Sequence, residues 1–367
     1  MNMPLKGWWS RWTPGAKFRH SRCGFTLVEV LVVVGILALL LAITVPAVMR
    51  ARETAARASC LNNLRQIGVA LSLHQEHFGF FPSAAPARRT HQGHKSYKYV
   101  STADPSGLFE LLPFLEQMTL YNATNLSDGG RAVFGTGPEN STCRQALIGT
   151  FLCSSDRARS QPGYAPVSYR FNVGAALAGV RFSDEPVVTI KPGDYMTQAA
   201  AFQPVRGLAA AEYTDGLSVT AGICERVLGS ESSFDARRDF VYTASMPLLA
   251  PEGADQLASL CSSVQGTPPF YSNDFGHSWM GAGYQDVLYN HVLTPGSPAP
   301  DCTAERKVAA DYLVNWVAVA PRSLHGGGAN CLTMDGAVHF IRSQIHPSVW
   351  RALGTRSGGE AITAGAY

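Results

Sequence analysis

A run of twenty residues without a charged side chain, Val30–Met49, constrains this chain more than any other feature. Valine, leucine, isoleucine and alanine supply most of the run. At a rise of about 1.5 Å per residue, a helix of this length crosses the hydrocarbon core of a bilayer, which is ~30 Å thick. The run therefore predicts one membrane-spanning helix.

The charges around this run predict its orientation. Residues 1–24 carry five positive charges and no acidic side chain. The five are Lys6, Arg11, Lys17, Arg19 and Arg22. Positive charge before a spanning helix keeps the N-terminus in the cytoplasm, so the chain after Met49 is exported. Without the five charges the net charge falls from +3 to 3 − 5 = −2, and we expect no nucleic-acid partner.

The eight cysteines are scattered along the chain and include no C-x-x-C pair. They therefore match no common metal-binding pattern, and they favour an oxidising compartment. From the sequence we assign no metal ligand and no cofactor.

The octapeptide that leads into the apolar run is Cys23-Gly24-Phe25-Thr26-Leu27-Val28-Glu29-Val30. It resembles the prepilin cleavage and methylation motif of type IV pilins and secretion-system pseudopilins. The resemblance implies that a prepilin peptidase cuts after Gly24 and methylates the new amino group of Phe25. A secretory signal would instead be cut behind the apolar run, where the sequence offers only a weak site.

Glu29 is the only charged residue between Arg22 and Arg50. A carboxylate costs roughly 2.5–3.5 kcal/mol at the centre of a spanning helix and less near its edge, so Glu29 is expected to have a partner. We expect that partner to be the Phe25 amine of a neighbouring subunit, which assigns Glu29 to assembly. The simpler alternative is an ordinary anchor with an incidental glutamate.

Helical periodicity continues beyond the membrane. Apolar residues recur at helical spacing at Leu61, Leu64, Ile67, Leu71 and Phe78. Gly79 and Pro82 then end the pattern. Residues 25–78 would form one helix about 80 Å long, spanning the membrane over 25–49 and continuing as an amphipathic extracytoplasmic helix over 50–80.

Residues 81–367 are rich in glycine and proline and contain short strand-like runs such as Val187–Ile190. They predict a globular head of mainly antiparallel sheet, so the fold class is α+β, with a long helix packed on the sheet as in pilins. A shorter helix is expected at Gly107–Tyr121. Asn125–Gln145 and Leu228–Gly283 are expected to be insertions or loops, because turn formers occur there without sustained periodicity.

Asp335-Gly336 lies between two apolar runs near the C-terminus. This dipeptide predicts a type I′ hairpin within residues 325–341, in which both central residues have positive φ. Met334 would then face Ala337, and Leu332 would face His339.

His325, nine intervening residues and Asp335-Gly336 form a motif that resembles one in a large family of prepilin-like proteins of unknown function, abundant in planctomycete bacteria. The resemblance also covers Leu61–Gly68, Leu111–Gln117, Phe151–Asp156, Thr214–Ser218, Tyr289–Val292 and Trp350–Glu360. That family has no established reaction. Cys60 and Cys153 lie in these blocks, one on the helix and one in a loop expected to pack on it, so we expect a disulfide between them.

His325-Gly326-Gly327-Gly328 copies the oxyanion-hole sequence of some lipases and esterases. A hydrolase of that class would also need a G-x-S-x-G nucleophile, which the sequence lacks. We expect instead a glycine-rich turn that enters the hairpin, with His325 bonded to nearby backbone.

Two kinds of metal site are alternatives to this structural reading. His74 and His77 lie three residues apart on the helix, but no H-E-x-x-H frame accompanies them, and a histidine packed at an interface is the expectation. The second alternative is a calcium site at Asp215, Asp301 or Asp335, because some pseudopilins bind calcium in loops. Aspartate before glycine is first of all a turn signal.

These features predict a structural, pseudopilin-like subunit and not an enzyme, within a type II secretion or type IV pilus-related assembly. Its expected partners are prepilin peptidase, other pilin-like subunits and the bacterial inner membrane, with the head in the periplasm. The alternative is a membrane-tethered periplasmic binding or adhesion protein that does not polymerise. Aromatic residues such as Tyr164, Tyr169 and Phe171 could line a groove for a secreted substrate or glycan, but we expect them to pack in the core.

Processing gives the first test. Mass spectrometry of the mature chain should find N-methylphenylalanine at position 25, and Gly24→Val should leave the precursor uncut, because the peptidase of this family requires a small residue before the bond. A mature N-terminus near Ala47 would contradict the pilin interpretation.

Overall fold

The computed structural model describes residues 26–84, 105–125, 140–156, 162–174, 199–203, 206–243, 253–303 and 317–362. Gly24, Phe25 and the run Val187–Ile190 lie outside these ranges. The chain divides into two units, Met1–Arg52 and Glu53–Tyr367, which are described separately below.

Helix α1 spans Leu27–Phe78, so the single long helix predicted from the sequence is confirmed. Thr26 and Glu29 form a capping box at its start: the Thr26 N–H donates to Glu29 Oε2 at 2.8 Å, and the Glu29 N–H donates to Thr26 Oγ1 at 3.3 Å. The helix runs through Pro46 and ends before Gly79, whose φ of +84° no helical residue adopts.

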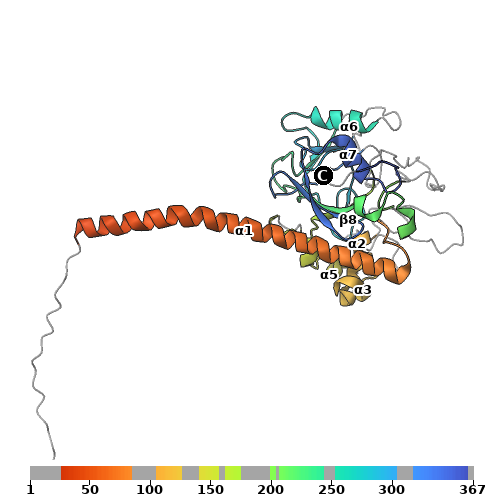
Figure 1. The fold of residues 1–367 in the computed structure, drawn as a ribbon, viewed down its shortest axis with the longest axis horizontal. Coiled ribbons are helices and arrows are strands. Elements are labelled where there is room, and N and C mark those ends of the chain that lie inside the picture. Colours follow the sequence, from red (N-terminus) through yellow and green to blue (C-terminus); the bar gives the residue numbers. More distant parts are fainter. Residues whose placement is uncertain are drawn as a thin grey trace, which may run out of the picture. The chain divides into compact units, whose positions relative to one another are not determined.

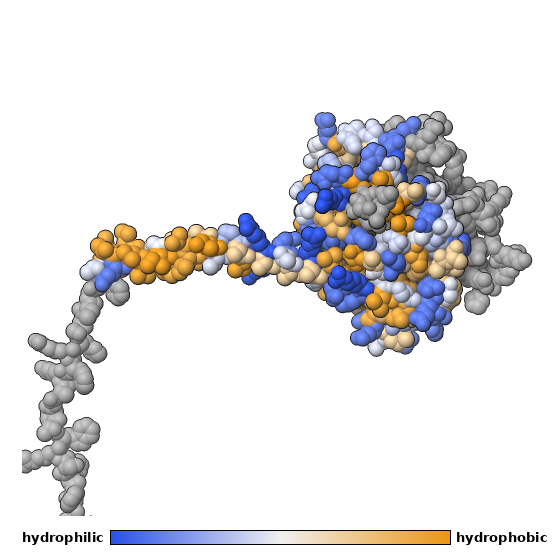
Figure 2. Space-filling model, viewed as in Figure 1, coloured by the Kyte–Doolittle hydropathy of each residue, from blue (hydrophilic) through white to orange (hydrophobic). Residues whose placement is uncertain are grey.

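In the first unit, the side chains of α1 form an almost continuous apolar surface (Figure 2). Large apolar side chains from Leu27 to Met49 are exposed on every face of the helix. Among the described residues, α1 is the helix that is long and apolar enough to cross a bilayer. A core helix of a soluble protein would bury such side chains, so this half of α1 is built for an apolar surrounding.

In the second unit, α1 is a core element of the head (Figure 1). One face of the helix is buried at Cys60, Leu64, Ile67, Gly68, Ala70, Leu71 and His74. This face joins the main hydrophobic cluster of the head, so the second half of α1 packs on the sheet as predicted.

The main sheet has five strands in the order β5-β1-β2-β8-β9. Their bounds are β1 (Tyr169–Asn172), β2 (Ala221–Glu225), β5 (Leu288–Tyr289), β8 (Gly328–Thr333) and β9 (Val338–Arg342). Neighbouring strands are antiparallel except β1 and β5, which are parallel. The α+β class is confirmed, and Tyr169 and Phe171 on β1 are fully buried, as expected for core residues.

A second sheet of four strands has the order β4-β3-β6-β7. Its strands are β3 (Phe240–Tyr242), β4 (Tyr271–Ser272), β6 (Asp301–Thr303) and β7 (Val317–Ala318). Helix α6 (Gly253–Ser262) shares a separate hydrophobic cluster with this sheet. The interpretation of Leu228–Gly283 as a loop was therefore wrong, because strands of two or three residues are too short to give a period-two pattern.

Short helical turns connect these layers. They are α2 (Gly107–Leu111), η1 (Leu112–Leu115), α3 (Met118–Ala123), α5 (Ser141–Arg144), η2 (Gly149–Phe151), η3 (Ala210–Glu212), η4 (Leu217–Val219) and α7 (Pro347–Leu353). The first three replace the single helix predicted at Gly107–Tyr121. Pro113 lies in the 3-10 turn, and Glu116 takes a left-handed φ of 61° that interrupts the helix. Of the loop predicted at Asn125–Gln145, the described part contains α5.

The β8–β9 hairpin forms where predicted, but its turn type and register were predicted wrongly. Cys331 faces His339, and Leu332 faces Val338. The loop has three residues, since the Thr333 N–H donates to Ala337 O and the Gly336 N–H donates to Thr333 O. Positive φ occurs at Gly336 alone (+89°), which is a type I turn followed by a left-handed glycine.

Gly336 allows a test in which steric contact plays no part. An added Cβ at Gly336 or at Gly326 meets no atom within 4 Å, but φ is left-handed only at Gly336. Gly336→Val should lower the free energy of unfolding by well over about 1 kcal/mol, because a β-branched residue resists positive φ. Gly326→Val is the matched control. Equal denaturation midpoints for the two variants would contradict the assignment of the turn.

Candidate functional site

The residues predicted for processing and assembly lie at the start of the chain. Gly24 and Phe25 fall outside the described residues. Glu29 is exposed, and its carboxylate accepts hydrogen bonds from the backbone N–H and the hydroxyl of Thr26, each at 2.8 Å. The glutamate thus has a local partner within its own chain.

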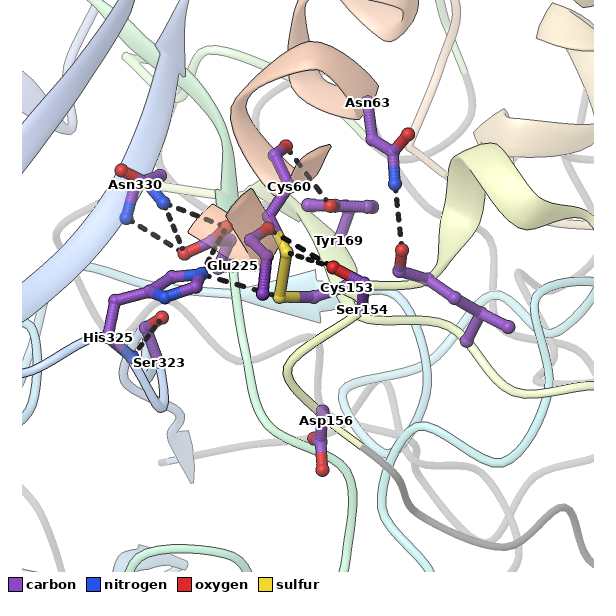
Figure 3. Close-up of a disulfide and its surroundings, with 12 residues drawn as sticks. Cys60, Asn63, Cys153, Ser154, Asp156, Tyr169, Glu225, Ser323, His325 and Asn330 are labelled. Atoms are coloured by element: carbon purple, nitrogen blue, oxygen red, sulfur yellow. Dashed lines mark hydrogen bonds and ion pairs between the residues drawn. A yellow bond between two sulfur atoms is a disulfide. The ribbon is translucent and has the colours of Figure 1, made fainter. Parts of the chain in front are cut away.

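The structure forms the expected disulfide between Cys60 on α1 and Cys153 in the loop after η2 (Figure 3). It closes a loop of 93 residues, which stabilises the fold by about 4 kcal/mol in the chain-entropy model. Two further disulfides are Cys224–Cys331, between β2 and β8, and Cys261–Cys302, between α6 and β6. Cys143 is buried with a free thiol.

The side chain of His325 lies beside the Cys60–Cys153 disulfide (Figure 3), and its two ring nitrogens face the carboxylates of Glu53 and Glu225. Its Nδ1 is 2.8 Å from Glu53 Oε1. Its Nε2 is 3.6 Å from Cys153 Sγ and 4.0 Å from Glu225 Oε1. The expectation of a bond to nearby backbone was wrong: the ring crosses to other elements, and the backbone N–H of His325 bonds to the Ser323 hydroxyl.

Glu225 at the end of β2 supplies the second carboxylate and is almost fully buried. The carboxylate of Glu225 accepts hydrogen bonds from two groups of Asn330 on β8. The backbone N–H donates at 3.1 Å and the side-chain amide at 2.9 Å. Burial nevertheless raises the pKa of Glu225 above its ordinary value. A buried carboxyl beside an imidazole and two sulfur atoms can hold a proton or bind a cation.

Sequence reasoning singled out neither Glu53 nor Glu225. A signal for Glu53 existed, because it precedes Cys60 by seven residues, or two helical turns, and so lies on the same face of α1. No local pattern marks Glu225, which reaches the cluster only through strand pairing.

The two ends of the His325–Gly336 motif both contact α1. His325 bonds to Glu53, whereas the turn at Gly336 packs against Gly68. A Cβ on Gly68 would lie 2.9 Å from Leu332 Cδ1 and 3.4 Å from Gly336 Cα. The contacts are fifteen residues apart on the helix, about 22 Å at 1.5 Å per residue. The motif therefore holds α1 along the length of β8.

The alternative metal ligands have protein partners. His74 is buried, packs against Phe114 and bonds to Phe80 O, as expected for an interfacial histidine. Asp335 accepts from Thr333 Oγ1, within the turn that it was expected to form. Asp215 accepts two backbone N–H groups, from Gly358 and Gly359.

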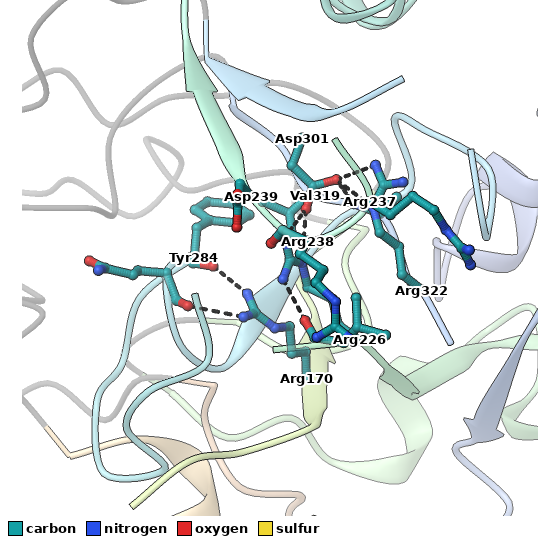
Figure 4. Close-up of polar contacts among 12 residues, drawn as sticks. Arg170, Arg226, Arg237, Arg238, Asp239, Tyr284, Asp301, Val319 and Arg322 are labelled. Carbon is teal, nitrogen blue, oxygen red and sulfur yellow. Dashed lines mark hydrogen bonds and ion pairs between the residues drawn. The ribbon is translucent and has the colours of Figure 1, made fainter. Parts of the chain in front are cut away.

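Asp301, the third alternative calcium ligand, is instead the centre of a buried ion-pair network (Figure 4). The guanidinium groups of Arg226 and Arg322 each approach one of its oxygens at 2.7 Å. Although burial opposes ionisation, these two cations hold the pKa of Asp301 below its ordinary range. Arg170, nearby, donates to the backbone carbonyls of Tyr284 and Gln285. The network joins the two sheets, and two arginines occupy the carboxylate oxygens that a calcium ion would need.

The head contains an open cavity of about 1130 Å³. It is lined mainly by polar residues of the loop that follows β2, and also by Asp156 and Leu324. Asp156 lies three residues after Cys153, and Leu324 directly precedes His325. Tyr164 lies outside this lining and stacks edge-on against His277.

His291 is the most strongly desolvated histidine that the structure describes. Its ring stacks on Trp350 with centroids 3.7 Å apart. Nδ1–H donates to the carbonyl of Trp350, which leaves Nε2 to accept from the Tyr289 hydroxyl at 3.2 Å. Burial lowers the pKa of His291 to about 3.

Comparison with known families gives two matches. The model of a family described as "Protein of unknown function (DUF1559)" matches residues 49–348, and a model of the prokaryotic N-terminal methylation motif matches residues 19–45. The first range covers the disulfide cluster and the hairpin, and the second covers Gly24, Phe25 and Glu29. No curated protein and no solved structure matches the chain.

The pKa of His291 predicts an acid sensitivity. The unfolded chain binds a proton here below about pH 6.5, whereas the folded chain does not bind it until about pH 3, so stability is lost as pH falls through this window. Between pH 7.5 and 5.0 the loss is about 2 kcal/mol, at 1.36 kcal/mol per pKa unit. Denaturant midpoints of His291→Gln should change less over this interval than those of the wild type and of His339→Gln. Parallel profiles for all three proteins would refute the assignment.

Proposed function

Because the chain belongs to the DUF1559 family of proteins of unknown function and carries an N-terminal methylation motif, we propose that it is a pseudopilin-like structural subunit and not an enzyme. In this proposal a prepilin peptidase cuts it after Gly24, and α1 holds it in the bacterial inner membrane with the head in the periplasm. It co-assembles there with other pilin-like subunits of a type II secretion or type IV pilus-related machine.

The proposal rests mainly on the difference in exposure between the two halves of α1. Residues from Leu27 to Met49 expose apolar side chains all around the helix, whereas the face from Cys60 to His74 is buried in the head. A helix built this way offers its first half to lipid or to other helices while its second half belongs to a folded domain. Subunits that assemble through such helices display their heads outside the helical bundle.

Glu29 supplies the specific contact in this assembly. In the single chain its carboxylate is bonded to Thr26, so it caps the helix. Within a bundle the low dielectric strengthens pairing with the charged amine of a neighbour's Phe25, and this pairing sets the axial stagger between subunits.

One feature favours the alternative of a tethered periplasmic binding or adhesion protein that does not polymerise. The open cavity has a volume of about 1130 Å³, slightly above the ~300–1,000 Å³ that is typical of ligand sites, and a lining rich in polar groups that a ligand could contact. Both functions use the same anchor, so they differ in whether Glu29 is needed for contact between chains.

Glu29 variants separate charge from capping. Glu29→Gln keeps a side chain that can cap the helix but removes the charge, whereas Glu29→Ala removes both. If the charge pairs with a neighbour, both variants should insert, be cut at Gly24 and lose crosslinking between single cysteines placed in Val30–Met49. Glu29→Asp should be intermediate because its reach is shorter.

Processing is followed in the same samples by mass spectrometry, so that a failure to mature is not mistaken for a failure to assemble. Crosslinking of Glu29→Gln at the wild-type level, with loss only in Glu29→Ala, would reduce Glu29 to a capping residue. Wild-type crosslinking in both variants would favour the tethered monomer.

A further inference from the structure

Four side chains of the types that bind transition metals converge at one buried point of the head. They are Cys60, Cys153, Glu225 and His325, and their ligand atoms all lie within 4.8 Å of one another. They come from four separate segments: α1, the loop after η2, the end of β2 and the loop before β8 (Figure 3). Such convergence of buried polar groups needs a physical reason, because burying them costs free energy.

One spacing already matches that of a tetrahedral zinc site, and the remaining ligands, apart from the two bonded sulfurs, would have to move closer together around an ion. Zinc binds thiolate sulfur at about 2.3 Å and imidazole nitrogen at about 2.0 Å, which places these two ligand atoms about 3.5 Å apart. Cys153 Sγ and His325 Nε2 are 3.6 Å apart, and His325 Nε2 and Glu225 Oε1 are 4.0 Å apart. Cys60 and Cys153 are bonded to each other, so a metal-bound state requires this bond to be reduced.

The surrounding groups orient the cluster as they do in metal sites. Glu53 accepts from His325 Nδ1–H at 2.8 Å, which leaves the lone pair of Nε2 directed at the cluster. Asn330 holds both oxygens of Glu225 through its side-chain amide. Both arrangements are the outer hydrogen bonds that commonly fix a histidine and a carboxylate ligand.

We propose that Cys60, Cys153, Glu225 and His325 bind one Zn²⁺ ion when the two cysteines are reduced, so that the disulfide and the zinc site are alternative states of one cluster. A dithiol reductant supplies two electrons and two protons to the disulfide and is itself oxidised to a disulfide. Zinc then binds both sulfurs as thiolates and releases the two protons. In a newly exported chain the thiols are already present, and zinc binding competes with their oxidation.

The set of ligands selects the metal. Two thiolates with an imidazole suit zinc and copper(I), but a carboxylate as the fourth ligand favours Zn²⁺. The ion would also bring positive charge to the buried Glu225, whose described contacts include the amide of Asn330 and the imidazole of His325. Asp301, by contrast, already has two guanidinium groups as partners.

The open cavity lies near the cluster in sequence, because Asp156 and Leu324 line it and lie within three residues of Cys153 and His325 respectively. The proposal concerns the head alone and holds whether or not the chain polymerises.

The test uses the full chain in detergent, reduced with a phosphine that is then removed without oxygen. Co²⁺ is the first probe, because its thiolate charge-transfer and d–d absorption bands report sulfur ligands and tetrahedral geometry. Zn²⁺ should displace it at one ion per chain. The oxidised protein should bind neither ion at this site.

Variants assign the ligands. Glu225→Gln and His325→Gln retain the cysteines, and each should lose saturable binding. Glu53→Gln, a positioning variant, should weaken it by about 10- to 100-fold. A Cys261→Ser, Cys302→Ser double variant is the matched control, since it removes a different disulfide and should bind zinc like the wild type. Circular dichroism of each oxidised variant checks that the fold is kept.

Alkylation provides a second readout that does not depend on affinity. Zinc should protect Cys60 and Cys153 in the reduced wild type while the other thiols react, and His325→Gln should abolish this protection. The proposal is overturned if the reduced wild type binds no ion, if binding survives in Cys60→Ser, Cys153→Ser, or if zinc leaves both cysteines reactive.

Discussion

The contact between α1 and the β8–β9 hairpin is the constraint on which the head depends. At Gly68 the helix approaches so closely that a Cβ would lie 2.9 Å from Leu332 Cδ1. The Cys60–Cys153 disulfide and the His325–Glu53 bond hold the same helix further towards its start. Because α1 contributes its buried face to the main hydrophobic cluster, the helix is part of the core of the head and not a detachable stalk.

Two buried acidic residues show how partners decide what a carboxylate can do. Asp301 has a guanidinium on each side, and its charge is compensated within the protein. Glu225 has an amide, an imidazole and two sulfur atoms, so its environment resembles the ligand set of a metal site. The first arrangement ties two sheets together, and the second makes the junction with α1 responsive to redox state and to metal.

At the other end of α1, the same reasoning applies to a single glutamate. The bonds between Thr26 and Glu29 satisfy the first turn of the helix within one chain. In the proposed assembly, the amine of another chain would become a stronger partner in a medium of low dielectric. The bond to Thr26 is compatible with that proposal, because it can be exchanged for the intermolecular pair.

Local sequence accounted for the long helix and for the position of the C-terminal hairpin. The apolar run, the helix to Phe78 and its end at Gly79 follow from composition, periodicity and a glycine in the left-handed region. The position of the β8–β9 hairpin followed from Asp335-Gly336, but not its register, because one extra loop residue changes which side chains face each other. The second sheet was missed because its strands are too short to carry a periodic signal.

The cluster around His325 shows where sequence reasoning ends. By itself the sequence determined a long helix whose first half is too apolar for water and whose second half has one face to bury. The resemblance to a known family also suggested that Cys60 pairs with Cys153. Only the tertiary structure brought Glu53 and Glu225 to His325, which is 272 residues from the first of them. No local rule encodes such a meeting, because strand pairing and helix packing decide it together, through burial that the whole head provides.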